Sequence, residues 1–101
     1  MIIQYLKADN TQQFILKGRL DHHTSGKFNE FIQSHYTKAH DVILDAQQLD
    51  YISGVGLRSL INLAKLVRTD QMAIRVKAPD GGLMHKLLTL SGFIKILPLL
   101  Q

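Results

Sequence analysis

The chain has 101 residues, which is close to the commonest size of a single protein domain. Hydrophobic residues make up 46% and charged residues 20%, a balance that is typical of globular proteins and excludes general disorder. The formal charge is +4, but the basic residues are scattered without a run or an interleaved aromatic stripe, so we expect no nucleic-acid binding.

The sequence contains no cysteine, which excludes disulfide bonds and thiolate chemistry and permits a reducing compartment. The opening residues MIIQYLKADN lack the basic and apolar regions of a signal peptide. No apolar stretch approaches the roughly 20 residues that a membrane-spanning helix needs. We therefore expect a single cytoplasmic domain over residues 1–101 without membrane insertion.

Hydrophobic periodicity divides the chain into strands and helices. Strands are indicated by alternation or by short apolar runs, and helices by apolar residues that recur every three or four positions. In chain order we expect strands at 1–8 and 14–20, a helix at 26–39, a strand at 41–46, a helix at 53–70, a strand at 72–78, a helix at 80–91, and a terminal strand or tail at 93–100. This β-β-α-β-α-β-α order predicts an α/β fold with a mixed sheet of four to five strands and helices packed on it.

The boundaries of these elements carry recognisable signals. Thr24 or Ser25 is a candidate N-cap of the first helix, and Asp80 is a candidate N-cap of the third. Gly92 stands where a left-handed residue would end the third helix. The polar segments DNTQQ and QQLDYI are expected to be a turn and a loop. On the second helix we expect a buried stripe of Leu57, Leu60, Ile61, Ala64 and Val67.

The segment Asp21-His22-His23-Thr24 is the first candidate site. A carboxylate beside two histidines suggests a metal site or an acid–base pair. Adjacent side chains rarely point to the same place, however, and no further ligand stands at a suitable spacing. We interpret the segment as a polar loop before a helix and expect neither a metal nor a cofactor.

The segment Ser53-Gly54-Val55-Gly56 is the second candidate. It lacks the Gly-Lys-Ser/Thr ending of a phosphate-binding loop, the three glycines of a dinucleotide fingerprint and the pattern of a nucleophile elbow. The entry to a helix nevertheless exposes free backbone N–H groups, and glycines let another surface approach closely. Two interpretations stay open: Ser53 is only an N-cap, or the segment is a docking surface that phosphorylation switches.

Asp45 and Asp50 could in principle act as paired carboxylates. Turn formation or helix capping explains both more simply, because Asp45 is expected to end a buried strand and Asp50 to lie in the loop that follows it. No nucleophile, base and orienting group can be assembled from this sequence. We therefore expect a protein that is not an enzyme.

Three segments of the sequence resemble the STAS domains, in particular the bacterial anti-sigma factor antagonists. LKGRLDHHTSGKF is similar to the family's second strand, its Asp-His-His-Thr loop and its first helix. VILDAQQLDYISGVGLRSLI is similar to the central strand, loop and helix that carry the phosphorylation motif, and LMHKLLTLSGFIKIL to the C-terminal helix. The resemblance implies a mixed sheet with packed helices and a non-enzymatic binding protein in a partner-switching circuit.

In such a circuit the unphosphorylated protein binds an anti-sigma factor that is also a serine kinase of the histidine-kinase-like ATPase type. Phosphorylation by that kinase breaks the contact, and a phosphatase restores it. The resemblance implies a partner-binding surface formed by Asp21, His22, His23, Thr24, Ser53, Gly54, Val55, Gly56 and Arg58.

The family motif is Asp-Ser-Ser/Thr-Gly-Leu, in which the first serine is modified. When it is aligned on Gly56 and Leu57, Ser53 takes the place of the aspartate, Gly54 that of the modified serine and Val55 that of the second Ser/Thr. Because glycine cannot be phosphorylated, either Ser53 has taken over the switch or the protein is a permanently unphosphorylated binder. We favour the second, since a shift of one residue at a helix entry turns the hydroxyl in another direction.

Two other functions stay open. Small STAS proteins also serve as cytoplasmic subunits of phospholipid-transporting ABC systems, where they bind the ATPase without a phosphoserine. The loss of the modifiable serine fits that function, whereas the Asp-His-His-Thr loop fits it less well. The third possibility is a scaffold subunit of a larger sensory assembly.

Overall fold

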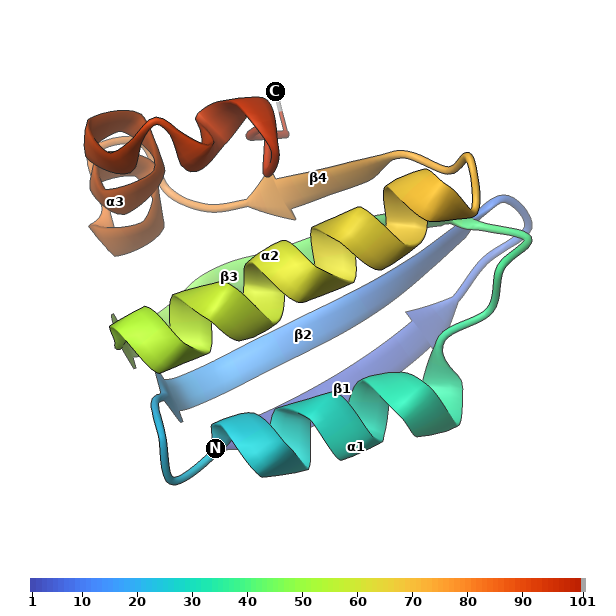
Figure 1. Cartoon of the computed structure of the whole chain (residues 1–101), viewed down its shortest axis with the longest axis horizontal. Helices are drawn as coiled ribbons and strands as arrows, with labels where there is room; N and C mark the ends of the chain where they lie inside the picture. Colours follow the sequence, from blue (N-terminus) through green and yellow to red (C-terminus); the bar gives the residue numbers. More distant parts are fainter. Residues whose placement is uncertain (101) are drawn as a thin grey trace.

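The structure, a computed structural model, describes residues 1–100 and is built around a single mixed sheet (Figure 1). Its elements are β1 (Ile2–Lys7), β2 (Thr11–Leu20), α1 (Ser25–His35), β3 (Asp41–Ile52), α2 (Gly54–Thr69), β4 (Ile74–Lys77), α3 (Leu83–Ser91) and the short 3-10 helix η1 (Phe93–Lys95). The α/β class and the β-β-α-β-α-β-α order predicted from the sequence are confirmed.

The four strands are ordered β1-β2-β3-β4 in the sheet. β1 and β2 form an antiparallel hairpin, while β2, β3 and β4 run parallel to one another. Parallel strands end at the same edge of a sheet, so the connections that follow β2 and β3 come out side by side. In Figure 1 this edge lies at the left, where α2 begins.

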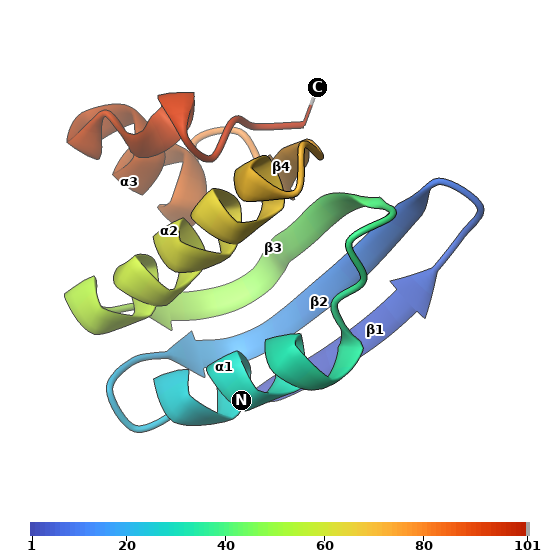
Figure 2. The same cartoon turned by 45° about the vertical axis from the view of Figure 1, so that its right-hand side comes forward.

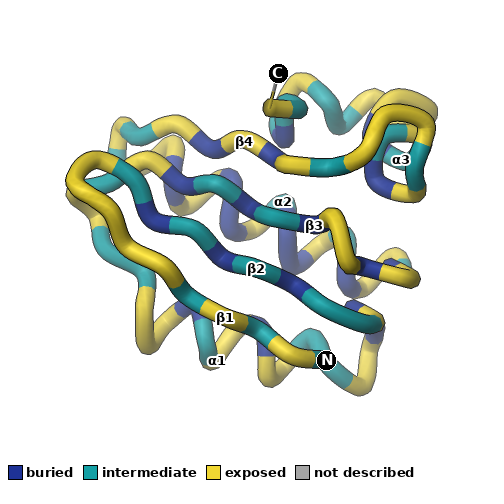
Figure 3. Tube along the Cα trace, turned by 180° about the vertical axis from the view of Figure 1, so that it is seen from behind, coloured by how far each residue is buried: buried dark blue, intermediate teal, exposed yellow. Residues whose placement is uncertain are grey.

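The core lies between the sheet and the helices α1 and α2, which cover one of its faces (Figure 2). The strands contribute alternate residues to it, as the period of two requires. These residues include the fully buried Phe14, Leu16 and Leu44, which pack with Leu60 and Ala64 of α2. Seen from behind, the opposite face of the sheet carries no helix from the described part of the chain (Figure 3).

One polar side chain, Gln12, is completely buried in β2, where the sequence predicted the turn DNTQQ. That prediction is confirmed for Asp9 and Asn10, which form the turn, and is wrong for the other three residues because the strand begins at Thr11. The Gln12 amide nitrogen donates to the carbonyls of Thr37 (2.6 Å) and His40 (3.1 Å). Its oxygen accepts from the Thr37 N–H (3.0 Å) and the Tyr5 hydroxyl (3.2 Å). All four hydrogen-bonding positions of the amide are used, which ties the connection between α1 and β3 to the sheet.

The predicted loop QQLDYI is the second half of β3, so that prediction is also wrong. Leu49 and Ile52 are buried there, and β3 has one extra residue relative to β2 at each of two register shifts. At the first shift the Asp45 carboxylate accepts a hydrogen bond from the Gln47 N–H (3.0 Å). Asp45 and Asp50 therefore lie within a strand, and neither ends it.

The helices also differ in detail from the prediction. α1 ends at His35, four residues early, and the Tyr36 hydroxyl beyond it donates to Asp70 at 2.6 Å. Gly82 stands at the N-cap of α3, where Asp80 was predicted, while Gly92 closes α3 in the left-handed conformation as expected.

The terminal strand predicted at 93–100 is not formed. Its first residues are η1, and of the rest only Leu99 pairs with the sheet, through one parallel bridge to Val76 of β4. The Val76 N–H donates to the Pro98 carbonyl (2.8 Å), and the Val76 carbonyl accepts from the Leu100 N–H (2.7 Å).

Candidate functional site

The candidate site is built on the carbonyl of Leu20, the last residue of β2. The backbone N–H of Ser53, at the end of β3, donates to this oxygen at 3.0 Å. The bond joins the last residue of β2 to the N-cap residue that precedes α2. Two segments that are about 30 residues apart in the sequence thereby form one surface at the edge of the sheet.

The Asp21–Thr24 segment forms a compact hydrogen-bonded turn rather than a ligand set. The Thr24 hydroxyl accepts from the Asp21 N–H (2.9 Å) and donates to the Arg19 carbonyl (2.9 Å). Thr24 does stand at the N-cap of α1, but its side chain makes no capping bond because these two groups occupy it. His22 and His23 are exposed, with ring centroids 3.8 Å apart.

Asp21 is the buried member of this turn. Desolvation opposes its ionisation, but the hydrogen bonds from the His23 and Thr24 N–H groups outweigh it and lower the pKa of Asp21 below its ordinary value. Its Oδ1 accepts from the His23 N–H at 3.0 Å. The carboxylate is thus engaged in holding the turn, and the two imidazoles are left facing outward.

Ser53 is the N-cap of α2, as one of the two interpretations predicted. It has extended backbone angles, and its hydroxyl oxygen accepts from the Gly56 N–H at 3.1 Å. Its side chain is half-buried. The hydroxyl therefore faces the first turn of the helix and already serves a structural purpose.

The two glycines of this turn differ in what surrounds them. A Cβ atom on Gly56 would lie 2.3 Å from the Leu20 carbonyl oxygen, so only glycine fits where α2 crosses the end of β2. A Cβ atom on Gly54 would meet nothing within 4 Å. Glycine is thus required by the fold at position 56 but not at position 54.

Val55 and Arg58 are exposed on the first turns of α2, and 48% of the Val55 surface is open to solvent. Two residues that the sequence did not single out, Arg19 and Tyr51, lie beside Asp21. The Arg19 guanidinium lies over the Tyr51 ring at 4.3 Å and approaches Asp21 with its Nε 3.6 Å from Oδ2. No local sequence pattern indicates this contact, because Arg19 and Tyr51 are paired only through the shifted register of β2 and β3.

Leu57 and Ile61 were predicted to be core residues, and this is wrong in part. The buried stripe of α2 runs through Gly56, Ser59, Leu60, Leu63, Ala64 and Val67. Leu57 and Ile61 are only half-buried and line a groove against Phe93 of η1.

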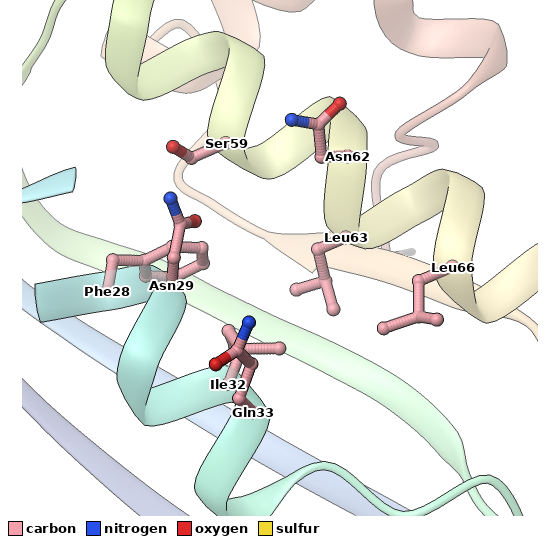
Figure 4. Close-up of a pocket in the computed structure, with 8 residues that line it drawn as sticks. All are labelled: Phe28, Asn29, Ile32, Gln33, Ser59, Asn62, Leu63 and Leu66. Atoms are coloured by element: carbon pink, nitrogen blue, oxygen red, sulfur yellow. The ribbon is translucent and has the colours of Figure 1, made fainter. Parts of the chain in front are cut away.

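A second groove, of about 270 Å³, lies between α1 and α2 (Figure 4). Its apolar side chains are Phe28, Ile32, Leu63 and Leu66, and its polar ones Asn29, Gln33, Ser59 and Asn62. None of these carries a charge. The groove therefore offers no titratable acid or base for catalysis.

Within residues 1–100 we find no group of three or more His, Asp or Glu side chains that could hold a metal ion. Among the helices of the same residues, none is long and apolar enough to cross a membrane.

Comparison with known proteins assigns the chain to a family. The family model described as "Mlab, STAS domain" matches residues 3–100. The chain belongs to this STAS domain family. Among curated proteins, no sequence matches this STAS domain significantly.

Solved structures share the fold of this STAS domain. An anti-sigma factor antagonist from Mycobacterium paratuberculosis is 18% identical over 97% of this chain and 83% of its own, with a TM-score of 0.84. The Bacillus cell fate determinant SpoIIAA in its phosphorylated form is 17% identical over 99% and 92%, with a TM-score of 0.74. The anti-sigma factor antagonist SpoIIAA in its unphosphorylated form is 16% identical over 99% and 87%, with a TM-score of 0.71.

The two glycines predict opposite effects of the same substitution. Gly56→Ala places a methyl group against the Leu20 carbonyl and should lower the free energy of unfolding by about 1–3 kcal/mol. Gly54→Ala enters open space and should leave stability unchanged or raise it by about 0.4–1 kcal/mol. Urea denaturation of both variants measures the difference, and equal stabilities would contradict the close approach of α2 to β2.

Proposed function

We propose that this STAS domain is a regulatory binding protein of the anti-sigma factor antagonist type and has no catalytic activity of its own. Its surface for a partner comprises Asp21, His22, His23, Thr24, Ser53, Gly54, Val55, Gly56 and Arg58. The observation that carries the proposal is the exposed first turn of α2, which is held at the Leu20 carbonyl, beside the Asp21–Thr24 turn, which follows Leu20 directly in the chain.

This geometry suits binding better than catalysis. The Asp21 carboxylate is engaged in its turn, and the Ser53 hydroxyl is engaged in the helix cap. What points outward is an apolar side chain, Val55, with the Arg58 guanidinium one turn further on. A partly apolar patch with an arginine is a common composition for a protein interface.

The partner that we propose is a serine-kinase-type anti-sigma factor with a histidine-kinase-like ATPase fold. The similar structures described as anti-sigma factor antagonists support this choice of partner class. A phosphatase has no necessary part in the cycle, because position 54 offers no hydroxyl to modify.

We further propose that the protein stays in its binding-competent state. Gly54 cannot accept a phosphate, and the fold does not require glycine there. The neighbouring Ser53 is half-buried and uses its hydroxyl oxygen to cap α2. Both observations favour the loss of the switch over its transfer to Ser53.

The same glycine favours a second candidate function, that of a cytoplasmic subunit of a phospholipid-transporting ABC system. A subunit that binds an ATPase without a phosphoserine has no use for a hydroxyl at position 54. The docking surface would be the same, so the two functions differ in the partner that it recognises.

A binding assay with both partner classes tests the proposal. The purified chain is titrated with the kinase domain of an anti-sigma factor and, separately, with an ABC ATPase. We expect a complex with one of them, and Val55→Asp should weaken it about tenfold or more because it buries a charge in the interface.

Leu90→Asp is the matched control, since Leu90 is 86% exposed on α3 and lies outside the proposed surface. Both variants should fold, because an exposed substitution typically changes stability by no more than about 0.5 kcal/mol. Equal affinities of the two variants would rule out the α2 entry as the docking surface.

Phosphorylation provides a separate prediction. After incubation with the kinase and ATP, intact-mass spectrometry should show no phosphate on the natural chain. Gly54→Ser should gain one phosphate, because a serine side chain at this position enters open space. A phosphate on Ser53 of the natural chain would show that the switch had moved instead of being lost.

A further inference from the structure

A groove of about 500 Å³ continues the proposed docking surface along the outer side of α2. Leu57 and Ile61 of α2 and Phe93 of η1 provide its apolar side chains, and all three are half-buried. Gly54 and Arg58, which belong to the proposed surface, line the same groove. The groove and the docking surface are therefore continuous.

One wall of this groove is formed by η1, which a hydrogen bond joins to α2. The left-handed Gly92 turns the chain out of α3 and into η1. The Arg68 guanidinium, near the end of α2, donates to the Lys95 carbonyl at 2.6 Å and ties η1 to the helix. In Figures 1 and 2 the segment after α3 accordingly lies alongside α2.

The charged side chains that line the groove are all basic. Its polar lining residues are Arg58, Asn62 and Lys65, all of which are exposed. The whole of α2 contains no Asp or Glu side chain, and residues 81–101 contain none either. The groove between α1 and α2, which shares Asn62 with it, has no charged lining residue at all. The two sides of α2 thus differ in charge.

We propose that this α2–η1 groove binds a segment of the protein partner that carries apolar side chains flanked by carboxylates. The apolar side chains would cover Leu57, Ile61 and Phe93, and the carboxylates would meet Arg58 and Lys65. The inference rests on the proposed function and adds the chemistry of the partner's contact. A second copy of this chain does not fit, because its matching groove is also basic and the chain carries a formal charge of +4.

The charge complementarity makes the affinity depend on Lys65, which lies outside the surface first proposed. With the partner that binds the natural chain, Lys65→Glu should raise the dissociation constant about fivefold at low salt, since it replaces an attraction by a repulsion. It should also slow association and flatten the dependence of affinity on salt concentration.

Lys38→Glu is the matched control, because Lys38 is an exposed lysine in the connection between α1 and β3. The same charge reversal there should leave the affinity unchanged. Equal weakening by Lys38→Glu and Lys65→Glu would reflect net charge alone and would overturn the inference.

The affinities of the natural chain, Val55→Asp and Lys65→Glu distinguish a failure of this inference from a failure of the proposed function. If Val55→Asp abolishes binding and Lys65→Glu binds like the natural chain, the proposed function stands and the groove inference fails. If the natural chain binds neither the kinase domain nor the ABC ATPase, the proposed function fails and the inference fails with it.

Discussion

The arrangement of this site depends on one backbone oxygen, the carbonyl of Leu20. It accepts a hydrogen bond from Ser53, and it lies so close to Gly56 that no side chain fits between them. The end of β2 and the beginning of α2 are thereby held at backbone contact. Since the Asp21–Thr24 turn follows Leu20 directly, its position relative to α2 is fixed by the same oxygen.

This close contact shows which residues at the start of α2 are required by the fold and which are free to serve a function. Gly56 and the Ser53 cap are explained by packing and by the helix terminus. Gly54, Val55 and Arg58 have no such explanation, because they point away from the protein at the helix entry. The residues that the fold leaves unexplained are those on which a partner could act, and the α2–η1 groove extends them along the helix.

Sequence reasoning identified the order of the elements because periodicity and turn residues report local structure directly. It misassigned the second half of β3, since Gln47, Gln48 and Asp50 are polar and only the pairing with β2 makes them a strand. It placed Ile61 in the core because a helical stripe does not reveal where the neighbouring elements end. The Arg19–Tyr51 contact also depends on the register of two strands, which no local pattern encodes.

Amide hydrogen exchange of the chain, alone and in complex with its partner, tests the docking surface most directly. The first N–H groups of a helix have no intrahelical acceptor, so they exchange rapidly unless something covers them. The account predicts slower exchange in the complex at His22, Gly54 and Val55, whose N–H groups take no part in the hydrogen bonds that hold the two turns in the free chain. Protection confined to β1 and the open face of the sheet, with these residues unchanged, would contradict it.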